Sequence, residues 1–211
     1  MTTTWIGRSR ARAAAFALLV PCVACDATGP VACDLPLAGG NCLVFEDGGA
    51  LGPHRAAIEA GAIDALERVV AAMPVTGVTV RARAEPAGAI PELGLGGFNP
   101  SASEVILSFD PASPILSASI ASELGPTIAH ELHHARRRQT IGYGGTLLAA
   151  MVSEGLADHF SMELFGIGPP IWSTALDAPT ANALLGRAEG EGERSRYDHE
   201  LASQLRTLTA D

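Results

Sequence analysis

The 211-residue sequence has no lysine, so all 14 of its basic residues are arginine. Against 23 acidic residues they leave a formal net charge of −9, without the basic surface that nucleic-acid binding needs. The basic run Arg136-Arg137-Arg138 fits the end of a helix, where cations complement the helix dipole. We therefore expect no nucleic acid among the partners of this protein.

Aromatic residues are scarce, at 5%, although hydrophobic residues make up 47% of the chain. The core must therefore be built mostly from alanine, leucine, valine and isoleucine. The apolar run Ala13–Ala24 is shorter than the about 20 residues that span a bilayer, and Pro21 interrupts it. Three arginines precede this run, which predicts that residues 1–24 are a secretory signal peptide.

Cysteine is rare as well, and none of the four has the repeated spacing of a zinc ribbon. Val23-Ala24-Cys25 resembles the end of a bacterial lipobox, in which the cysteine becomes a lipid-modified N-terminus. We expect membrane attachment through a lipid on Cys25, with plain cleavage nearby as the alternative. Cys33 and Cys42 then remain to form a disulfide in an oxidising compartment. The protein is thus expected to be exported, as a cell-envelope lipoprotein or as a periplasmic or secreted protein.

Residues 25–52 are rich in glycine, proline and aspartate, which predicts a tether with a disulfide loop and one short strand at Leu43–Phe45. Residues 53–211 are predicted to form a single domain of α+β class, with a small, mainly antiparallel sheet packed on helices. Hydrophobic periodicity and breaker residues indicate its elements. We expect helices at Pro53–Met73, Ser117–Leu124, Pro126–Gln139, Leu147–Phe165, Ala175–Arg187 and His199–Leu208, strands at Val75–Ala84 and Glu104–Phe109, and a flexible connection at Glu92–Pro100.

The helix predicted at Pro126–Gln139 contains the sequence His130-Glu131-Leu132-His133-His134. Two histidines four residues apart share one face of a helix, so that His130 and His134 can bind one metal ion. Glu131 follows about 100° round the helix, where it can reach a water on that ion. The pattern is short and also fits a polar helix with surface histidines. Further residues are therefore needed to tell a metal site from such a helix.

The next predicted helix supplies those residues. Glu154 can add a third ligand and leave the fourth position open, as catalytic zinc requires. Asp158 stands four residues further on the same face, where it can accept a proton from a ligand imidazole. A metzincin arrangement would need glycine at position 137 and histidine at position 140, but the chain has Arg137 and Thr140. The remaining nearby histidines, His133 and His159, are expected to be supporting or surface residues.

These motifs resemble those of the gluzincins, the thermolysin-like zinc metallopeptidases. Ile128–Arg137 and Ser153–Phe160 look more closely like a bacterial family of predicted zinc-dependent proteases. Gly96-Gly97 before a strand, and Pro170-Ile171-Trp172, also look like that family, and the resemblance covers roughly residues 65 to 200.

The resemblance implies a role for each residue of the site. It makes His130, His134 and Glu154 zinc ligands, Glu131 the general base, and Asp158 the residue that orients His130. It also makes the strand at Glu104–Phe109 the edge along which an extended peptide pairs. Gluzincins use a histidine or tyrosine from further along the chain to stabilise the oxyanion, and the candidates here are Tyr197 and His199, with Tyr143 as a weaker one.

The leading hypothesis is therefore a zinc-dependent peptidase that acts on a peptide or protein substrate. A second hypothesis is an exported zinc-binding lipoprotein that keeps the metallopeptidase-like fold without turnover and has a binding or scaffold role. A third is a metal-free helical domain whose histidines match the motif by coincidence.

Overall fold

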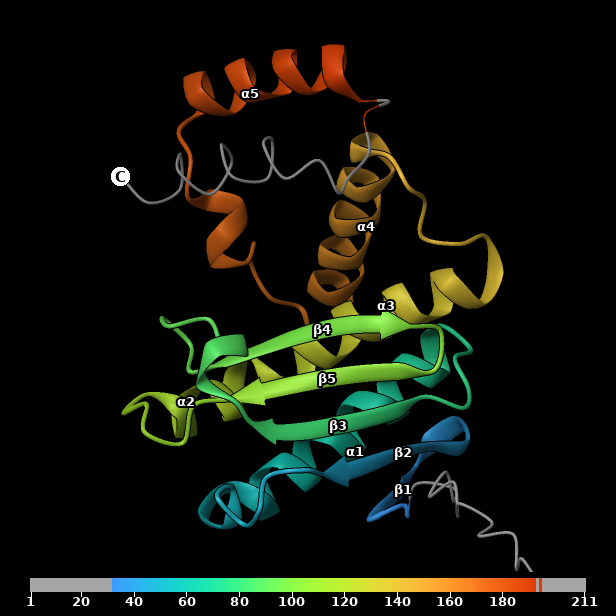
Figure 1. Ribbon diagram of the computed structural model, residues 1–211, viewed down its shortest axis with the longest axis vertical. Helices are drawn as coiled ribbons and strands as arrows, with labels where there is room; N and C mark the ends of the chain where they lie inside the picture. Colours follow the sequence, from blue (N-terminus) through green and yellow to red (C-terminus); the bar gives the residue numbers. More distant parts are fainter. Residues whose placement is uncertain (1–31, 193, 195–211) are drawn as a thin grey trace, which may run out of the picture. The chain divides into compact units, whose positions relative to one another are not determined.

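Figure 1 shows the computed structural model of the chain, which describes residues 32–192 and 194. These residues belong to one compact unit that begins at Ala32. The expected signal peptide, Cys25, Tyr197, His199 and the expected helix at 199–208 lie outside the described residues.

A five-stranded sheet with the order β1-β2-β3-β5-β4 forms the base of the fold. The expected α+β class is confirmed, and the sheet is mixed. The β1–β2 and β4–β5 pairs are antiparallel, and the β2–β3 and β3–β5 pairs are parallel. The strands are β1 (Leu35–Leu37), β2 (Asn41–Phe45), β3 (Thr79–Ala84), β4 (Leu95–Ser101) and β5 (Glu104–Phe109).

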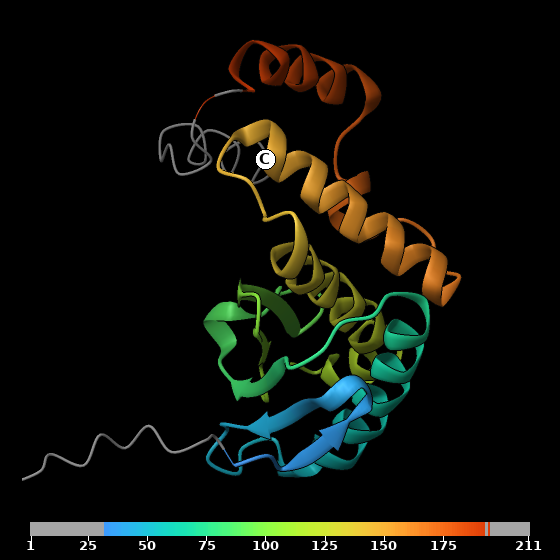
Figure 2. The same cartoon turned by 90° about the vertical axis from the view of Figure 1, so that its right-hand side faces the viewer.

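Helices α1 and α3 cover one face of the sheet, and α4 packs on α3 (Figures 1 and 2). Helix α1 is the crossover that joins the parallel strands β2 and β3. Among the described residues, no helix combines the length and apolarity needed to cross a membrane. The helices are α1 (Arg55–Ala72), α2 (Leu116–Ser122), α3 (Leu124–Thr140), α4 (Leu147–Phe165) and α5 (Ala178–Glu191), and short 3-10 turns occupy Ala38–Gly40, Gly52–His54, Pro86–Gly88 and Ile171–Thr174.

The two faces of the sheet differ in polarity, because apolar and charged side chains alternate along β3. Val80 and Ala82 are fully buried in the core, which is almost entirely aliphatic. Arg81 and Arg83 point to the opposite face and pair there with Glu104 of β5 and with Glu46, the residue after β2. The Nε of Arg81 lies 2.6 Å from Oε1 of Glu104, and the Nε of Arg83 lies 2.9 Å from Oε2 of Glu46. The apolar face of the sheet therefore meets the helices, and the charged face lies away from them.

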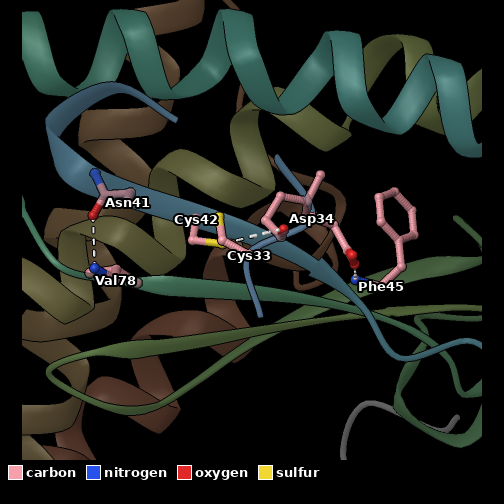
Figure 3. The surroundings of a disulfide bond; sticks show 7 residues. Cys33, Asp34, Asn41, Cys42, Phe45 and Val78 are labelled. Atoms are coloured by element: carbon pink, nitrogen blue, oxygen red, sulfur yellow. Dashed lines mark hydrogen bonds between the residues drawn. A yellow bond between two sulfur atoms is a disulfide. The ribbon is translucent and has the colours of Figure 1, made fainter. Parts of the chain in front are cut away.

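The sheet begins earlier than the expected tether would allow, because β1 and β2 form a hairpin within it. A disulfide joins Cys33 to Cys42 at this hairpin (Figure 3). The side chain of Asn41, only 3% exposed, accepts a hydrogen bond from the Val78 N–H at 2.8 Å and so ties β2 to the residue preceding β3. Asp34 accepts another from the Phe45 N–H at 2.7 Å. These contacts hold the β1–β2 hairpin in the sheet, although the composition of this segment alone indicates a loop.

Strand β4 corrects two expectations. Residues 92–100 were expected to be a flexible connection, but Leu95–Ser101 pairs with β5. Consequently β5 lies between β3 and β4, and the edge of the sheet is β4 rather than Glu104–Phe109. The register of the β4–β5 pair shifts between Phe98 and Ser101, so the strand is irregular near its end. Its two glycines suggested flexibility, whereas cross-strand pairing, which no local pattern reveals, makes this segment a strand.

Candidate metal centre

Helix α3 places the two motif histidines by burying its other face. Ile128, Leu132 and Ala135 recur at helical spacing and are completely buried against the core. This orientation turns His130 and His134 toward α4, the helix that packs on α3. The hydrophobic pattern of α3 thus determines where its polar residues point.

Helix α4 approaches α3 closely because the residues between them are small. Ser153, Ala157 and Ser161 recur every four residues along α4 and are buried. The helix starts as expected at Leu147, and the hydroxyl of the preceding Thr146 caps it by accepting a hydrogen bond from the Ala149 N–H at 3.2 Å. Next to the small-residue stripe, α4 presents Glu154 and Asp158 to the histidines of α3.

Three potential ligand atoms meet at one point between these helices. The Nε2 atoms of His130 and His134 are 3.0 Å apart, and they lie 3.1 and 3.2 Å from Oε2 of Glu154. Zinc bound tetrahedrally at its usual 2.0–2.1 Å would hold its ligands about 3.3 Å apart. Two imidazole nitrogens and one carboxylate oxygen are also a donor set of catalytic zinc sites. The residues present therefore fit a zinc ion and leave a fourth coordination position open.

Each histidine also has a partner on its other ring nitrogen. The Nδ1 of His130 lies 2.9 Å from Oδ1 of Asp158, and the Nδ1 of His134 lies 3.2 Å from the Ser153 hydroxyl. Such partners fix the tautomer and the orientation of a ligand imidazole. Asp158 is where the sequence analysis placed it, whereas Ser153 was missed. The sequence feature that could have indicated Ser153 is the small residue at every fourth position, Ser153, Ala157 and Ser161, which marks the buried face of α4.

Tyr143 joins the group from the loop between α3 and α4. Its hydroxyl donates a hydrogen bond to Oε1 of Glu154, and its ring centroid lies 5.1 Å from that of His134. The sequence ranked Tyr143 below Tyr197 and His199, which fall outside the described residues. Of the three oxyanion candidates, Tyr143 is the one that the described structure brings to the metal-binding group.

Carboxylates dominate the electrostatics of this group. Burial lowers the pKa of His130, but the nearby carboxylates of Asp158 and Glu154 outweigh this effect and raise it to about 10. Burial raises the pKa of Glu154, but hydrogen bonds from His130, His134 and Tyr143 bring it well below its usual value. The group therefore favours positive charge at its centre, as a site for a metal cation should.

Glu131 lies next to the ligands and is almost completely buried, with 7% of its surface exposed. This burial raises its pKa to about 7; the charge of His130 opposes the increase and that of Glu154 adds to it. The backbone of β4 passes very close to this side chain at Gly97. A Cβ atom at that position would lie 2.6 Å from Oε1 of Glu131, so only glycine leaves the carboxylate its place.

Two cavities flank the group, one on each side. A cavity of about 470 Å³ extends past Thr127 and His130 to Pro169–Trp172, and one of about 520 Å³ extends past His134 to Arg138. Both include Gly97, Glu131 and Glu154 in their walls. An extended ligand that follows β4 would therefore pass over the metal-binding residues and enter both cavities.

Trp172, in the wall of the first cavity, makes a second contact to Asp158. The indole Nε1 of Trp172 donates a hydrogen bond to Oδ2 of Asp158 at 3.1 Å, while Oδ1 of the same carboxylate faces His130. Trp172 is 47% exposed and lines the cavity wall. The sequence singled out this tryptophan without giving it a role.

We expect Trp172→Phe to weaken zinc binding, because the variant keeps the aromatic wall but removes the N–H that holds Asp158. Loss of a direct partner of a ligand histidine typically costs 10- to 100-fold in metal affinity, so this more distant contact should cost about 3- to 10-fold. Competition with a chromophoric chelator measures the change, and Asp158→Asn provides the larger reference effect. Unaltered zinc affinity in Trp172→Phe would show that the indole does not hold Asp158 in place.

The other two nearby histidines take no part in the group. The ring centroid of His133 lies 5.7 Å from that of Phe160, and burial lowers the pKa of His133 to about 4. His159 is exposed, and its Nδ1 lies 3.5 Å from Oε2 of Glu163. Only His130, His134 and Glu154 form a group suited to holding a metal ion within residues 32–192 and 194.

Comparison with known proteins gives one match. The model of the family described as "Predicted Zn-dependent protease (DUF2268)" matches residues 64–203, about two thirds of the chain. No curated protein and no solved structure matches the sequence. The matched range includes every residue of the metal-binding group. The family's zinc dependence and the His130–His134–Glu154 group together confirm zinc as the expected cofactor.

Proposed function

Because the chain belongs to this family of predicted Zn-dependent proteases, we propose that it hydrolyses peptide bonds at the His130–His134–Glu154 group, with Glu131 as general base. The observation that carries the proposal is the convergence of two imidazole nitrogens and one carboxylate oxygen beside a buried carboxylate that is not itself in that group. A structural zinc site would use four protein ligands and need no such base.

Each residue of the site has a separate role in the proposed mechanism. His130, His134 and Glu154 would hold the zinc ion, with Asp158 and Ser153 orienting the two imidazoles. When bound, zinc supplies a Lewis acid that polarises the scissile carbonyl and makes water a nucleophile near neutral pH. Glu131 takes the proton of the attacking water and passes it to the leaving amine.

Strand β4 provides the place for the substrate. The Leu95 carbonyl already accepts a hydrogen bond from the Ile90 N–H, but around Gly97 the backbone of this edge strand is open to an added strand, so an extended peptide can pair there. Gly97 lies directly above Glu131, so a peptide paired there passes over the general base. Both cavities then receive side chains of the same peptide, one on each side of the scissile bond.

The negative charge that develops on the substrate carbonyl also needs a hydrogen-bond donor. Tyr143 is our candidate, because its hydroxyl already points at Glu154. Tyr197 and His199 stay predictions from the family resemblance. We further propose that the protein acts outside the cytoplasm, anchored through a lipid on Cys25, on peptide or protein substrates.

Metal analysis and a peptide library test this function together. We expect purified protein to contain close to one zinc ion per chain and to cleave library peptides. Removal of the metal with a chelator should abolish cleavage, and added zinc should restore it. A zinc-containing protein that cleaves no peptide would instead support the zinc-binding role without turnover. A protein without zinc would contradict both.

A further inference from the structure

The wall of the cavity of about 520 Å³ includes a positively charged side chain, Arg138, that the proposed mechanism does not use. Arg138 lies two helical turns after Glu131 on α3 and lines the wall of this cavity with Asn99 of β4 and Tyr143. The other cavity, beside Trp172, has no arginine among its lining residues. The two sides of the metal-binding group therefore differ in charge.

The Arg138 guanidinium is held firmly. Its Nε donates a hydrogen bond to Oδ1 of Asn99 at 2.7 Å, and its Nη2 donates to the Asn99 carbonyl at 3.2 Å. Its Cζ lies 4.7 Å from the centre of the Tyr143 ring. Asn99 is 3% exposed, and its own side-chain amide donates to the carbonyls of Ser101 and Glu104. These contacts thus fix the position of the Arg138 guanidinium before any ligand binds.

These contacts leave Arg138 without an acidic partner. Within residues 32–192 and 194, no carboxylate forms an ion pair with it, whereas Arg55, Arg68, Arg81 and Arg83 each have at least one such partner. A guanidinium has five N–H donors, and the hydrogen bonds to Asn99 use two of them. The cavity also borders Glu131 and Glu154, whose charges a bound zinc dication would balance. The charge of Arg138 then remains to attract an anion.

We propose that this cavity binds an acidic side chain of the peptide substrate through a charge-assisted hydrogen bond to Arg138. The proposal rests on the proposed peptidase function and specifies its substrate. Along β4 the chain runs from Gly97, beside Glu131, to Asn99, beside Arg138. A peptide paired antiparallel to β4, the slightly more stable arrangement, runs from Arg138 toward Glu131. Its acidic residue therefore precedes the scissile bond.

Matched peptides with both termini blocked test this specificity. They carry Glu, Gln or Lys at each of the two positions before the cleaved bond and are otherwise identical. We expect the wild-type protein to show kcat/KM about tenfold higher for Glu than for Gln, the low end for a charge-assisted hydrogen bond in a partly exposed site. Arg138→Gln should remove this preference, and Arg138→Glu should shift it toward Lys.

The matched control is Arg136→Gln, which removes the same charge from the same helix but lies outside both cavities. It should keep the tenfold preference. Equal cleavage of Glu and Gln peptides by the wild-type protein would overturn the proposal. So would an equal loss for both peptides in Arg138→Gln, because that result would mean that the arginine only supports β4 and Tyr143.

A binding measurement separates this proposal from the peptidase function itself. Fluorescent versions of the same peptides are titrated into the zinc-loaded Glu131→Gln variant, where no turnover is needed. Tighter binding of the Glu peptide, lost in the Glu131→Gln, Arg138→Gln double variant, supports the carboxylate site even if the wild-type protein cleaves nothing. A further peptide with a free C-terminus and no acidic side chain is titrated in the same way. If it binds more tightly than the Glu peptide, the cavity recognises a terminal carboxylate and the proposed side-chain recognition is overturned.

Discussion

Replacing Glu131 by glutamine is expected to lower peptide hydrolysis by about 10²- to 10⁴-fold, the usual contribution of a general base. The amide has the shape of the carboxylate, which matters because Glu131 is 7% exposed and packs under Gly97. It cannot take a proton from water, however. Because Glu131 is not in the group that would hold the metal, zinc content should stay close to that of the wild-type protein.

Single-turnover cleavage and metal analysis on the same preparation measure both parts of this prediction. Glu163→Gln is a suitable control, because it removes a carboxylate from the exposed side of α4, where Glu163 pairs with His159. The control should cleave at the wild-type rate. If Glu131→Gln cleaved peptides as fast as the wild-type protein, Glu131 would not be the base and the assigned mechanism would fail.

Gly97→Ala should produce the second large effect, about a 10²-fold loss of kcat/KM, although residue 97 carries no reactive group. The new Cβ would lie 2.6 Å from Oε1 and 2.7 Å from Cγ of Glu131, and 2.8 Å from Cγ2 of Thr127. Glu131 must then move, and a displacement of about 1 Å at a reacting group can cost that much in rate. The three atoms nearest to this methyl group belong to Glu131 and Thr127 rather than to the metal-binding residues, so zinc should be retained.

Kinetics with thermal unfolding of the same variant check this result. Gly145→Ala serves as the control, since a Cβ there meets no atom within 4 Å. The control should leave the rate unchanged. A Gly97→Ala protein that is folded, contains zinc and cleaves at the wild-type rate would show that the carboxylate does not need its observed position.

The metal-binding group was predictable because its geometry is local. His130 and His134 share a helix face by their spacing alone, and Glu154 and Asp158 follow the same rule on the next helix. Once two consecutive helices pack on each other, these four side chains come together. The chain's apolar periodicity indicated those helices to within about two residues at most ends.

The missed features depend on residues far apart in the sequence. Gly96 and Gly97 weaken a strand pattern, and only their pairing with Ser108 and Leu107 makes them part of one. Ser153 looks like an ordinary helix residue until α3 places the His134 ring against it. Likewise the Cys33–Cys42 hairpin looks like a loop until Asn41 and Val78 connect it to β3. Tertiary pairing, rather than local preference, determines these features.

The irregular end of β4 bears on self-association. An open strand edge invites pairing with the same edge of a second copy, which here would also cover Gly97 and the residues beneath it. Proline removes a backbone donor, and a shifted register interrupts the pairing ladder. In β4, Pro100 and the shift between Phe98 and Ser101 do both. The Leu95 carbonyl already accepts a hydrogen bond from the Ile90 N–H, so the pairing-competent edge is confined to Gly96–Phe98. That length accommodates a few residues of a peptide but gives two copies of the chain little surface on which to aggregate.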